Sequence, residues 1–248
     1  MKKFGLIGHP IAHSLSPALF KAAYDGKYAY DLIEGEDFET SYRRFIEEYD
    51  AINVTAPFKE AAFAKADILS EECASTGATN LLVKTPEGIK AYNSDFLGVR
   101  MWLSEVTEDL KGVKVLIVGL GGAGKAAAAA AESLGMDVIR MNRTVRDSQT
   151  HPLDDFRKCF RKANIIIYNI PAAIPELKEL TDSDFNEEKP KLILEANYKD
   201  PSLRETMESF GSKAVYTGGE TWLLYQAMTG YKILTGEKPD LTKMSDVL

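Results

Sequence analysis

The chain has 248 residues, 45% of them hydrophobic, so it can bury one or two cores without disulfides or metal sites. Its net charge of -7 disfavours a nucleic-acid partner, because phosphate binding requires a basic surface. The two cysteines, Cys73 and Cys159, form no disulfide framework or zinc motif, which predicts a reducing, cytoplasmic location. No stretch approaches the roughly 18 apolar residues of a membrane-spanning helix, so no membrane partner is expected.

Short apolar runs alternate with helical patterns in the first half of the chain, which is typical of a mainly parallel sheet covered by helices. Ser16 is predicted as the N-cap of the first helix, with Pro17 in its first turn. The turn Pro86-Glu87-Gly88 predicts a hairpin between the last two strands. In chain order, strands are expected at 4–8, 28–33, 51–55, 81–84 and 89–91, and helices at 17–24, 38–49 and 60–70.

A second α/β unit is predicted after a connecting helix at 95–104. Its strands are uninterrupted apolar runs, which indicates that helices cover both faces of the sheet. The last helical pattern, at 221–234, has no strand after it and could belong to either unit. The strands of the second unit are expected at 114–118, 137–141, 163–168 and 191–194.

A glycine-rich turn lies between the strand at 114–118 and an alanine-rich helix. Glycines here would let the backbone approach a diphosphate and let the helix pack closely on the sheet. The free N–H groups at the helix start would then hold the diphosphate, although a glycine turn without a ligand is the alternative. The residues concerned are Gly119, Gly121, Gly122, Ala123 and Gly124.

The end of the next strand indicates which dinucleotide binds. An NAD site usually places a carboxylate there, about 20 residues after the glycine turn, to bind the ribose hydroxyls. This strand instead ends in Asn142, Arg143 and Thr144, with Arg146 just beyond. Arginine matches a phosphate with a planar fork of donors, so the pattern favours the 2′-phosphate of NADP over ordinary surface charge.

Polar residues also follow the strands of the first unit, where open α/β sheets bind ligands. Each has an ordinary explanation alone, as a helix cap, a turn residue or a surface charge. Together they favour a ligand site. They are Ser14 and Ser16, Thr55 and Lys59, Asn80, and Asp95.

These segments resemble the shikimate dehydrogenase family over nearly the full length of the chain. The motifs that carry the resemblance stand in the family's order: GHPIAHSLSP at 8–17, NVTAPFK at 53–59, GATN at 77–80, NSD at 93–95, the glycine turn, NRT at 142–144, Gly218-Gly219 and Gln226-Ala227.

The resemblance implies an NADP-dependent enzyme of aromatic amino acid (chorismate) biosynthesis that reversibly reduces 3-dehydroshikimate to shikimate. It implies an α/β substrate-binding domain (1–100, joined by helices of 220–248) and a Rossmann-type NADP-binding domain (101–219), with a cleft between them. It places the catalytic pair on Lys59 and Asp95. It places substrate contacts on Ser14, Ser16, Thr55, Asn80, Tyr198 and Gln226, and adds Asn169 and Gly219 to the cofactor residues of the glycine turn and strand end.

The chemistry of the reaction agrees with this catalytic pair. Hydride arriving at a ketone leaves negative charge on oxygen, which needs a proton or a cation within hydrogen-bond reach. The Lys59 ammonium can supply both, and the Asp95 carboxylate holds it in place. Which of the two is the formal proton donor is left open. No metal is expected, because His9, His13 and His151 are scattered and lack ligand spacing.

Several positions depart from the family pattern. Where the family commonly has Asn-Ala-Thr-Pro, this chain has Asn169-Ile170-Pro171-Ala172 and so lacks the threonine expected to contact the cofactor. Glu195 replaces an aspartate, Ser94 a threonine, and Trp222 a flexible apolar residue beside the nicotinamide. The alternatives are a quinate/shikimate dehydrogenase, which often uses NAD, a folate-type dehydrogenase, and a non-catalytic regulatory module that binds the dinucleotide. The sequence leaves the oligomeric state open, with a homodimer as the candidate assembly.

Overall fold

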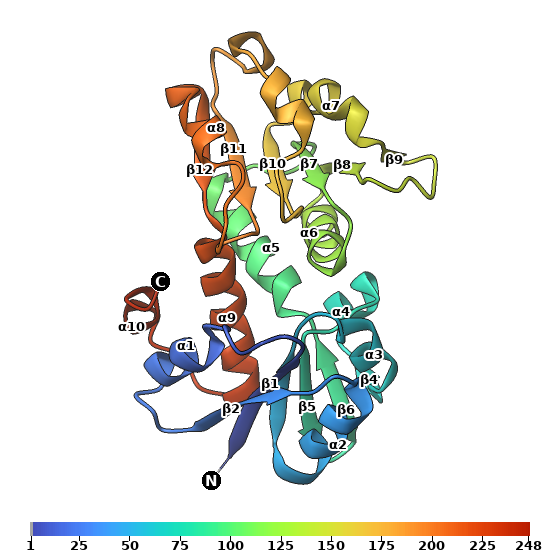
Figure 1. Cartoon of the computed structure of the whole chain (residues 1–248), viewed down its shortest axis with the longest axis vertical. Coiled ribbons are helices and arrows are strands. Elements are labelled where there is room, and N and C mark those ends of the chain that lie inside the picture. The colour runs from blue at the N-terminus through green and yellow to red at the C-terminus, as the bar shows by residue number, and fades with distance from the viewer. Residues whose placement is uncertain (1) are drawn as a thin grey trace. The chain divides into compact units, whose positions relative to one another are not determined.

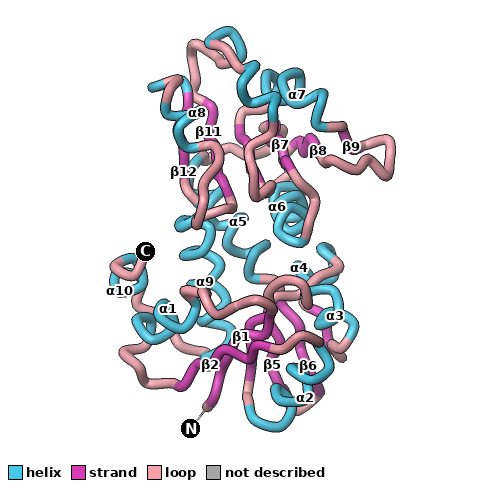
Figure 2. Tube along the Cα trace, in the orientation of Figure 1, coloured by secondary structure: helices cyan, strands magenta, loops and turns pink. Residues whose placement is uncertain are grey.

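The computed structural model describes residues 2–248. The chain divides into two compact units, one formed by the residues up to 98 with 224–248 and the other by residues 99–223. Each unit contains one six-stranded sheet, and strands alternate with helices in both (Figure 2). None of the helices within residues 2–248 combines the length and apolar character needed to cross a membrane. The predicted α/β class is confirmed.

The sheet of the first unit has the strand order β2-β1-β3-β5-β6-β4. Strands β2, β1 and β3 are parallel, whereas β5 is antiparallel to both of its neighbours. The predicted hairpin is confirmed as the pair β5–β6. The strands are β1 (Lys3–Gly8), β2 (Ala29–Glu34), β3 (Ala51–Val54), β4 (Ile68–Leu69), β5 (Leu81–Thr85) and β6 (Gly88–Tyr92).

Helices cover both faces of this sheet. One face packs on a core that includes Ile7, Ile52 and Phe45. On the other face, Phe20 of α1 contacts Tyr231 of α9 with ring centroids 4.8 Å apart, so the C-terminal part of the chain returns beside α1 and β1 (Figure 1). The helices are α1 (Ser16–Ala23), α2 (Phe38–Glu48), α3 (Lys59–Ala64), α4 (Glu71–Thr76), α10 (Leu241–Ser245), and parts of α5 (Ser94–Val106) and α9 (Gly219–Thr235).

The second unit has an entirely parallel sheet of order β12-β11-β10-β7-β8-β9, which confirms the Rossmann-type prediction. The chain proceeds from β7 to β8 on one side and later to β10 on the other. The strand order therefore reverses between β7 and β10, the usual place for a ligand in such sheets. The elements are β7 (Lys114–Val118), α6 (Gly122–Ser133), β8 (Asp137–Met141), β9 (Thr150–His151), α7 (Phe156–Lys162), β10 (Ile165–Tyr168), β11 (Lys191–Glu195), α8 (Arg204–Glu208) and β12 (Ala214–Thr217).

Two local predictions were wrong. The helix expected at 60–70 ends at Ala64, because Ile68 and Leu69 pair with β6 as an edge strand. Ser16 is not a cap; it is the first residue of α1, and Leu15 occupies the N-cap position without a side-chain hydrogen bond. The short elements α4, α7, α8, α10, β9 and β12 were not predicted.

Candidate active site

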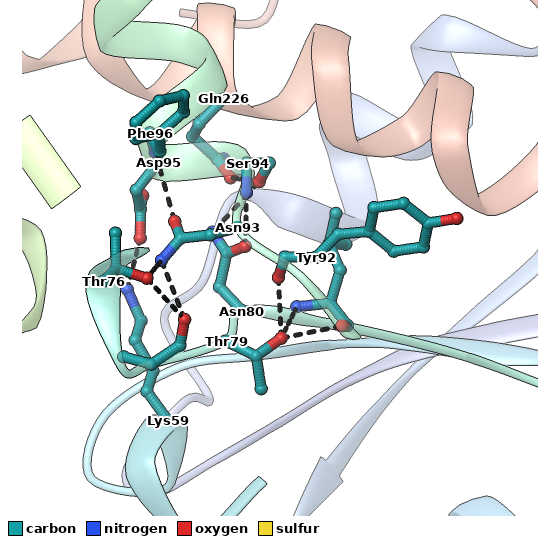
Figure 3. Close-up of polar contacts among 12 residues, drawn as sticks. Lys59, Thr76, Thr79, Asn80, Tyr92, Asn93, Ser94, Asp95, Phe96 and Gln226 are labelled. Carbon is teal, nitrogen blue, oxygen red and sulfur yellow. Dashed lines mark hydrogen bonds and ion pairs between the residues drawn. The ribbon is translucent and has the colours of Figure 1, made fainter. Parts of the chain in front are cut away.

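A lysine and an aspartate lie at the centre of the polar site in the first unit. Lys59 is the first residue of α3, and Asp95 lies in the first turn of α5. The Lys59 Nζ and Asp95 Oδ2 atoms are 2.5 Å apart, and the two side chains are 21% and 10% exposed (Figure 3). The carboxylate lies at the positive N-terminal end of α5. The pair can therefore present a proton or a positive charge to an oxygen within hydrogen-bond reach.

Two buried asparagines fix the start of the helix that carries Asp95. The Asn93 Oδ1 atom accepts a hydrogen bond from Phe96 N at 3.1 Å and caps the helix. The Asn80 Oδ1 atom accepts from Ser94 N at 2.7 Å. The Asn93 amide also donates to Thr76 Oγ1 at the end of α4 and to Ala78 O in the loop before β5, each at 3.0 Å (Figure 3). The capping role of Asn93 was missed, although an asparagine directly before a predicted helix is a signal for it.

Gln226 reaches this network from α9 through unusually close helix packing. The Ser94 hydroxyl accepts from Asn80 Nδ2 at 3.0 Å and donates to Gln226 Oε1 at 3.2 Å. A Cβ added at Gly98 would lie 2.7 Å from Gln226 N, and one at Gly230 would lie 3.0 Å from Ser94 Oγ. Both glycines therefore let α5 and α9 approach each other. The structure thus brings Lys59 and Asp95 together, and Asn80 and Gln226 together through Ser94.

Ser14, Ser16 and Thr55 follow the adjacent strands β1 and β3. Ser14 Oγ donates to Ser16 Oγ and accepts from Ser16 N, both at 3.2 Å. Thr55 N donates to Ile7 O at 2.8 Å. A Cβ at Gly8 would lie 2.3 Å from Thr55 Cγ2, so glycine is needed where these strand ends meet. The residues expected to contact the substrate thus follow strands at the edge where an open sheet binds ligands.

The glycine turn of the second unit fits a dinucleotide diphosphate. Gly119 has a positive φ of 88°, and a Cβ at Gly124 would lie 1.8 Å from Gly119 O, so both positions require glycine. A Cβ at Gly121 would meet no atom within 4 Å, which leaves the turn open on that side. The N-cap residue of α6 is Gly121, which has no side chain to bond the first N–H groups, and the helix begins with Gly122 and Ala123. Its first N–H groups can therefore face an anion.

The expected phosphate-binding residues lie in the loop after β8. Arg143, Thr144 and Arg146 are exposed there. Asn142 connects this loop to the glycine turn, because its Oδ1 accepts from Leu120 N at 3.4 Å and its Nδ2 donates to Thr144 O at 3.2 Å. The two predicted cofactor segments are therefore joined through one side chain.

The ends of β10 and β11 carry further expected site residues. Asn169 follows β10, and its Oδ1 is buried without a hydrogen-bond partner among residues 2–248, which leaves an acceptor next to the glycine turn. Tyr198 lies partly buried in the loop after β11, so within the second unit, and burial raises the pKa of its hydroxyl. A Cβ at Gly219 would lie 2.6 Å from Ala196 O, so glycine is needed beside that loop.

The departures from the family pattern have structural counterparts. Ile170 packs on the glycine turn, with its Cγ1 2.9 Å from where a Cβ of Gly119 would lie. Trp222 is 7% exposed within α9. The fully buried Glu195 anchors the loop after β11, a role that the sequence analysis missed. Its carboxylate accepts hydrogen bonds of 2.6 to 3.1 Å from Ser202 N and Oγ, Leu203 N and Tyr216 Oη.

The two-unit α/β fold with its Rossmann-type sheet is that of a dinucleotide-dependent oxidoreductase. Residues 6–82 match the shikimate dehydrogenase substrate binding domain, and the chain is 30% identical to the shikimate dehydrogenase (NADP(+)) of Thermotoga maritima over 93% of its length and 92% of the relative. It is 31% identical to that of Staphylococcus aureus, over 98% of this chain and 96% of the relative. The chain belongs to the shikimate dehydrogenase family.

Two further comparisons concern the fold and the nucleotide-binding unit. Residues 88–194 match the NAD binding domain of the D-isomer specific 2-hydroxyacid dehydrogenases. Shikimate 5-dehydrogenase from Thermus thermophilus, solved in complex with NADP(H) and shikimate, superimposes with a TM-score of 0.82 at 27% identity, covering 100% of this chain and 98% of that one. Quinate dehydrogenase from Corynebacterium glutamicum shares the fold, with a TM-score of 0.81 at 21% identity over 99% and 98% of the two chains.

Proposed function

We propose that this enzyme catalyses the reversible reduction of 3-dehydroshikimate to shikimate with NADPH. The first unit is the substrate-binding domain and the second unit the NADP-binding domain. The observation that carries the proposal is the contact between Lys59 and Asp95 in a chain with the family's motifs. The two opposite charges are 2.5 Å apart and mostly shielded from solvent. Such a pair can stabilise and protonate the oxygen of a carbonyl that is reduced to an alcohol.

The roles of the individual residues follow from their positions. NADPH supplies the hydride when it is bound. The Lys59 ammonium stabilises the charge that develops on the carbonyl oxygen, and the Lys59–Asp95 pair delivers one proton to that oxygen. In the oxidation direction the same pair takes the proton from the hydroxyl. Asn80, Gln226 and Thr55 bind ring hydroxyls.

Charge and hydroxyl groups orient the two ligands. Ser14 and Ser16 bind the substrate carboxylate through their hydroxyls. The N–H groups of the α6 start hold the NADP diphosphate, and Arg143 with Arg146 binds the 2′-phosphate. Thr144 and Asn169 supply further polar contacts at the same end of the sheet.

The test is an absorbance assay at the NADPH band with shikimate and NADP, repeated with quinate and with NAD. We expect oxidation of shikimate with NADP, and slower rates with either replacement. Lys59→Ala lowers kcat by about 10²–10⁴-fold with little effect on NADP affinity, because it removes the acid–base group alone. Lys65→Ala, an exposed lysine at the end of α3, is the control and keeps the wild-type rate. Near-normal turnover in Lys59→Ala refutes the assignment, and NADP binding without shikimate oxidation identifies a regulatory module instead.

A further inference from the structure

Two tyrosines of the first unit lie behind the residues expected to bind the substrate carboxylate and hydroxyls. Tyr231, on α9, donates from its hydroxyl to Ser16 O at 3.0 Å, across 215 residues of sequence. Tyr30, on β2, donates to Asn53 Oδ1 at 2.8 Å, across 23 residues. Each hydroxyl thus reaches a segment that carries a proposed substrate ligand: the serine turn in one case, and the end of β3 before Thr55 in the other.

Ring packing holds both hydroxyls in place. The Phe20 ring lies 4.6 Å from Tyr30 and 4.8 Å from Tyr231 between centroids, and the two tyrosine rings are 6.1 Å apart. Tyr231 is 1% exposed, so its polar end must find a partner within the protein. Burial raises the pKa of both tyrosines well above the ordinary value, so both are neutral donors.

The direction of the hydrogen bonds matters for an anionic ligand. Ser16 N donates to Ser14 Oγ, and the Ser14 hydroxyl donates to Ser16 Oγ. The Ser16 hydroxyl accepts one hydrogen bond there, so its own proton is available to another acceptor. A chain of donors pointing one way strengthens its last member. An anion at the end of that chain binds well only if Ser16 stays where Tyr231 holds it.

We propose that Tyr231 and Tyr30 are positioning residues: Tyr231 holds the serine turn in the geometry that binds the substrate carboxylate, and Tyr30 holds the end of β3 in the geometry in which Thr55 binds a ring hydroxyl. The proposal rests on the proposed function, because it takes the serine turn as the carboxylate site. It goes beyond that function by assigning a role to two side chains that do not themselves touch the reacting atoms.

The test compares Tyr231→Phe and Tyr30→Phe with Tyr24→Phe. The control residue belongs to the same aromatic cluster, with its ring 5.1 Å from Phe20, but its hydroxyl bonds to Thr235 and Glu237 instead. Each variant is assayed with shikimate and with shikimate methyl ester, which keeps the ring hydroxyls but carries no negative charge. Thermal unfolding is measured for all three variants.

We expect kcat/KM for shikimate to fall about five- to tenfold in Tyr231→Phe and Tyr30→Phe, through KM, as for the loss of one hydrogen bond. The KM for NADP stays at the wild-type value in both variants. The kcat/KM for the ester stays at the wild-type value in Tyr231→Phe, whereas in Tyr30→Phe it falls as it does for shikimate, because the ester keeps the ring hydroxyls. Tyr24→Phe loses comparable thermal stability but keeps its kcat/KM for shikimate.

Three results overturn the proposal: wild-type kcat/KM for shikimate in both variants, an equal loss with the ester in Tyr231→Phe, or an equal loss in Tyr24→Phe. Should Tyr231→Phe not fold, Tyr30→Phe decides by its kcat/KM for shikimate compared with that of Tyr24→Phe. A wild-type protein that does not oxidise shikimate refutes the proposed function itself, whereas an active wild type with unaffected variants refutes only this inference.

Discussion

Gly98→Ala tests the packing that brings Gln226 to the active site. The added Cβ would lie 2.7 Å from Gln226 N and 3.0 Å from both its Cα and Tyr225 C. These are backbone atoms of α9, so no side-chain rotation can make room. Non-bonded heavy atoms need about 3.5 Å, so the α9 backbone must retreat by about 0.8 Å. The hydrogen bond from Ser94 Oγ to Gln226 Oε1 is already 3.2 Å long and does not survive that shift.

Stability and substrate binding should respond differently to this change. Overpacking costs about 1–3 kcal/mol, whereas alanine is preferred over glycine in a helix by about 1 kcal/mol. The net loss in the free energy of unfolding is therefore about 0–2 kcal/mol, and Tm falls by about 2–4 °C for each kcal/mol in a chain of this size. The KM for shikimate rises by about tenfold, because Gln226 moves and loses its hydrogen bond from Ser94. The KM for NADP stays unchanged.

Steady-state kinetics and thermal unfolding of Gly98→Ala and Gly230→Ala provide the assay. The Cβ at Gly230 would meet Ser94 Oγ at 3.0 Å and Ser94 Cβ at 3.2 Å. A shift of the Ser94 hydroxyl weakens its bond to Gln226, but the backbone of Gln226 can stay in place. Gly230→Ala should therefore raise the KM less than Gly98→Ala does. An unchanged KM for shikimate in Gly98→Ala, or a larger effect in Gly230→Ala, refutes the reasoning.

Two further predictions concern buried charges in the second unit. Burial lowers the pKa of Lys191 to about 8 from its ordinary 10.5, so between these pH values the unfolded chain binds more protons and the free energy of unfolding rises with pH. Urea titrations at pH 8 and pH 10 should show this rise in the wild type and a smaller rise in Lys191→Met; equal slopes contradict the assignment. Glu195→Gln should lower the free energy of unfolding by about 2–3 kcal/mol. The NH2 group of the glutamine is a donor, and it would face N–H and O–H groups that now donate to the Glu195 carboxylate. Wild-type stability in urea would exclude an anchoring role for Glu195.

Local patterns predicted most strands because each has a clear apolar run between turn residues. The strands at 114–118 and 137–141 were confirmed to the residue. The segment at 60–70 was predicted as one helix because its apolar spacing suits a helix. Its hydrogen bonds to β6 decide the structure, however, and a partner 22 residues away leaves no mark in a local pattern. The edge strands β4, β9 and β12 are short as well, and they were missed for the same reason.

The candidate site was predictable where its residues stand at the ends of predicted strands, as Lys59 and Thr55 do. The long-range contacts were not predictable, because packing of whole helices creates them. Gly98 and Gly230 lie in helical patterns, where glycine alone only signals weak propensity. The structure gives the reason for both glycines, because α5 and α9 contact each other at these two positions.

The helix α9 contacts two different helices of the first unit with two of its sides. Gln226 and Gly230 are four residues apart and so share the side that meets α5, whereas Tyr231 follows about 100° further round and meets α1. A rotation of α9 that preserved one set of contacts would break the other. The hydrogen bonds from Lys59 to Asp95, from Ser94 N to Asn80 and from Phe96 N to Asn93 lie within the N-terminal part of the chain, whereas the Ser94 hydroxyl also bonds to Gln226 of α9. The proposed binding of the carboxylate and ring hydroxyls therefore depends on the docking of the C-terminal helix in one rotation.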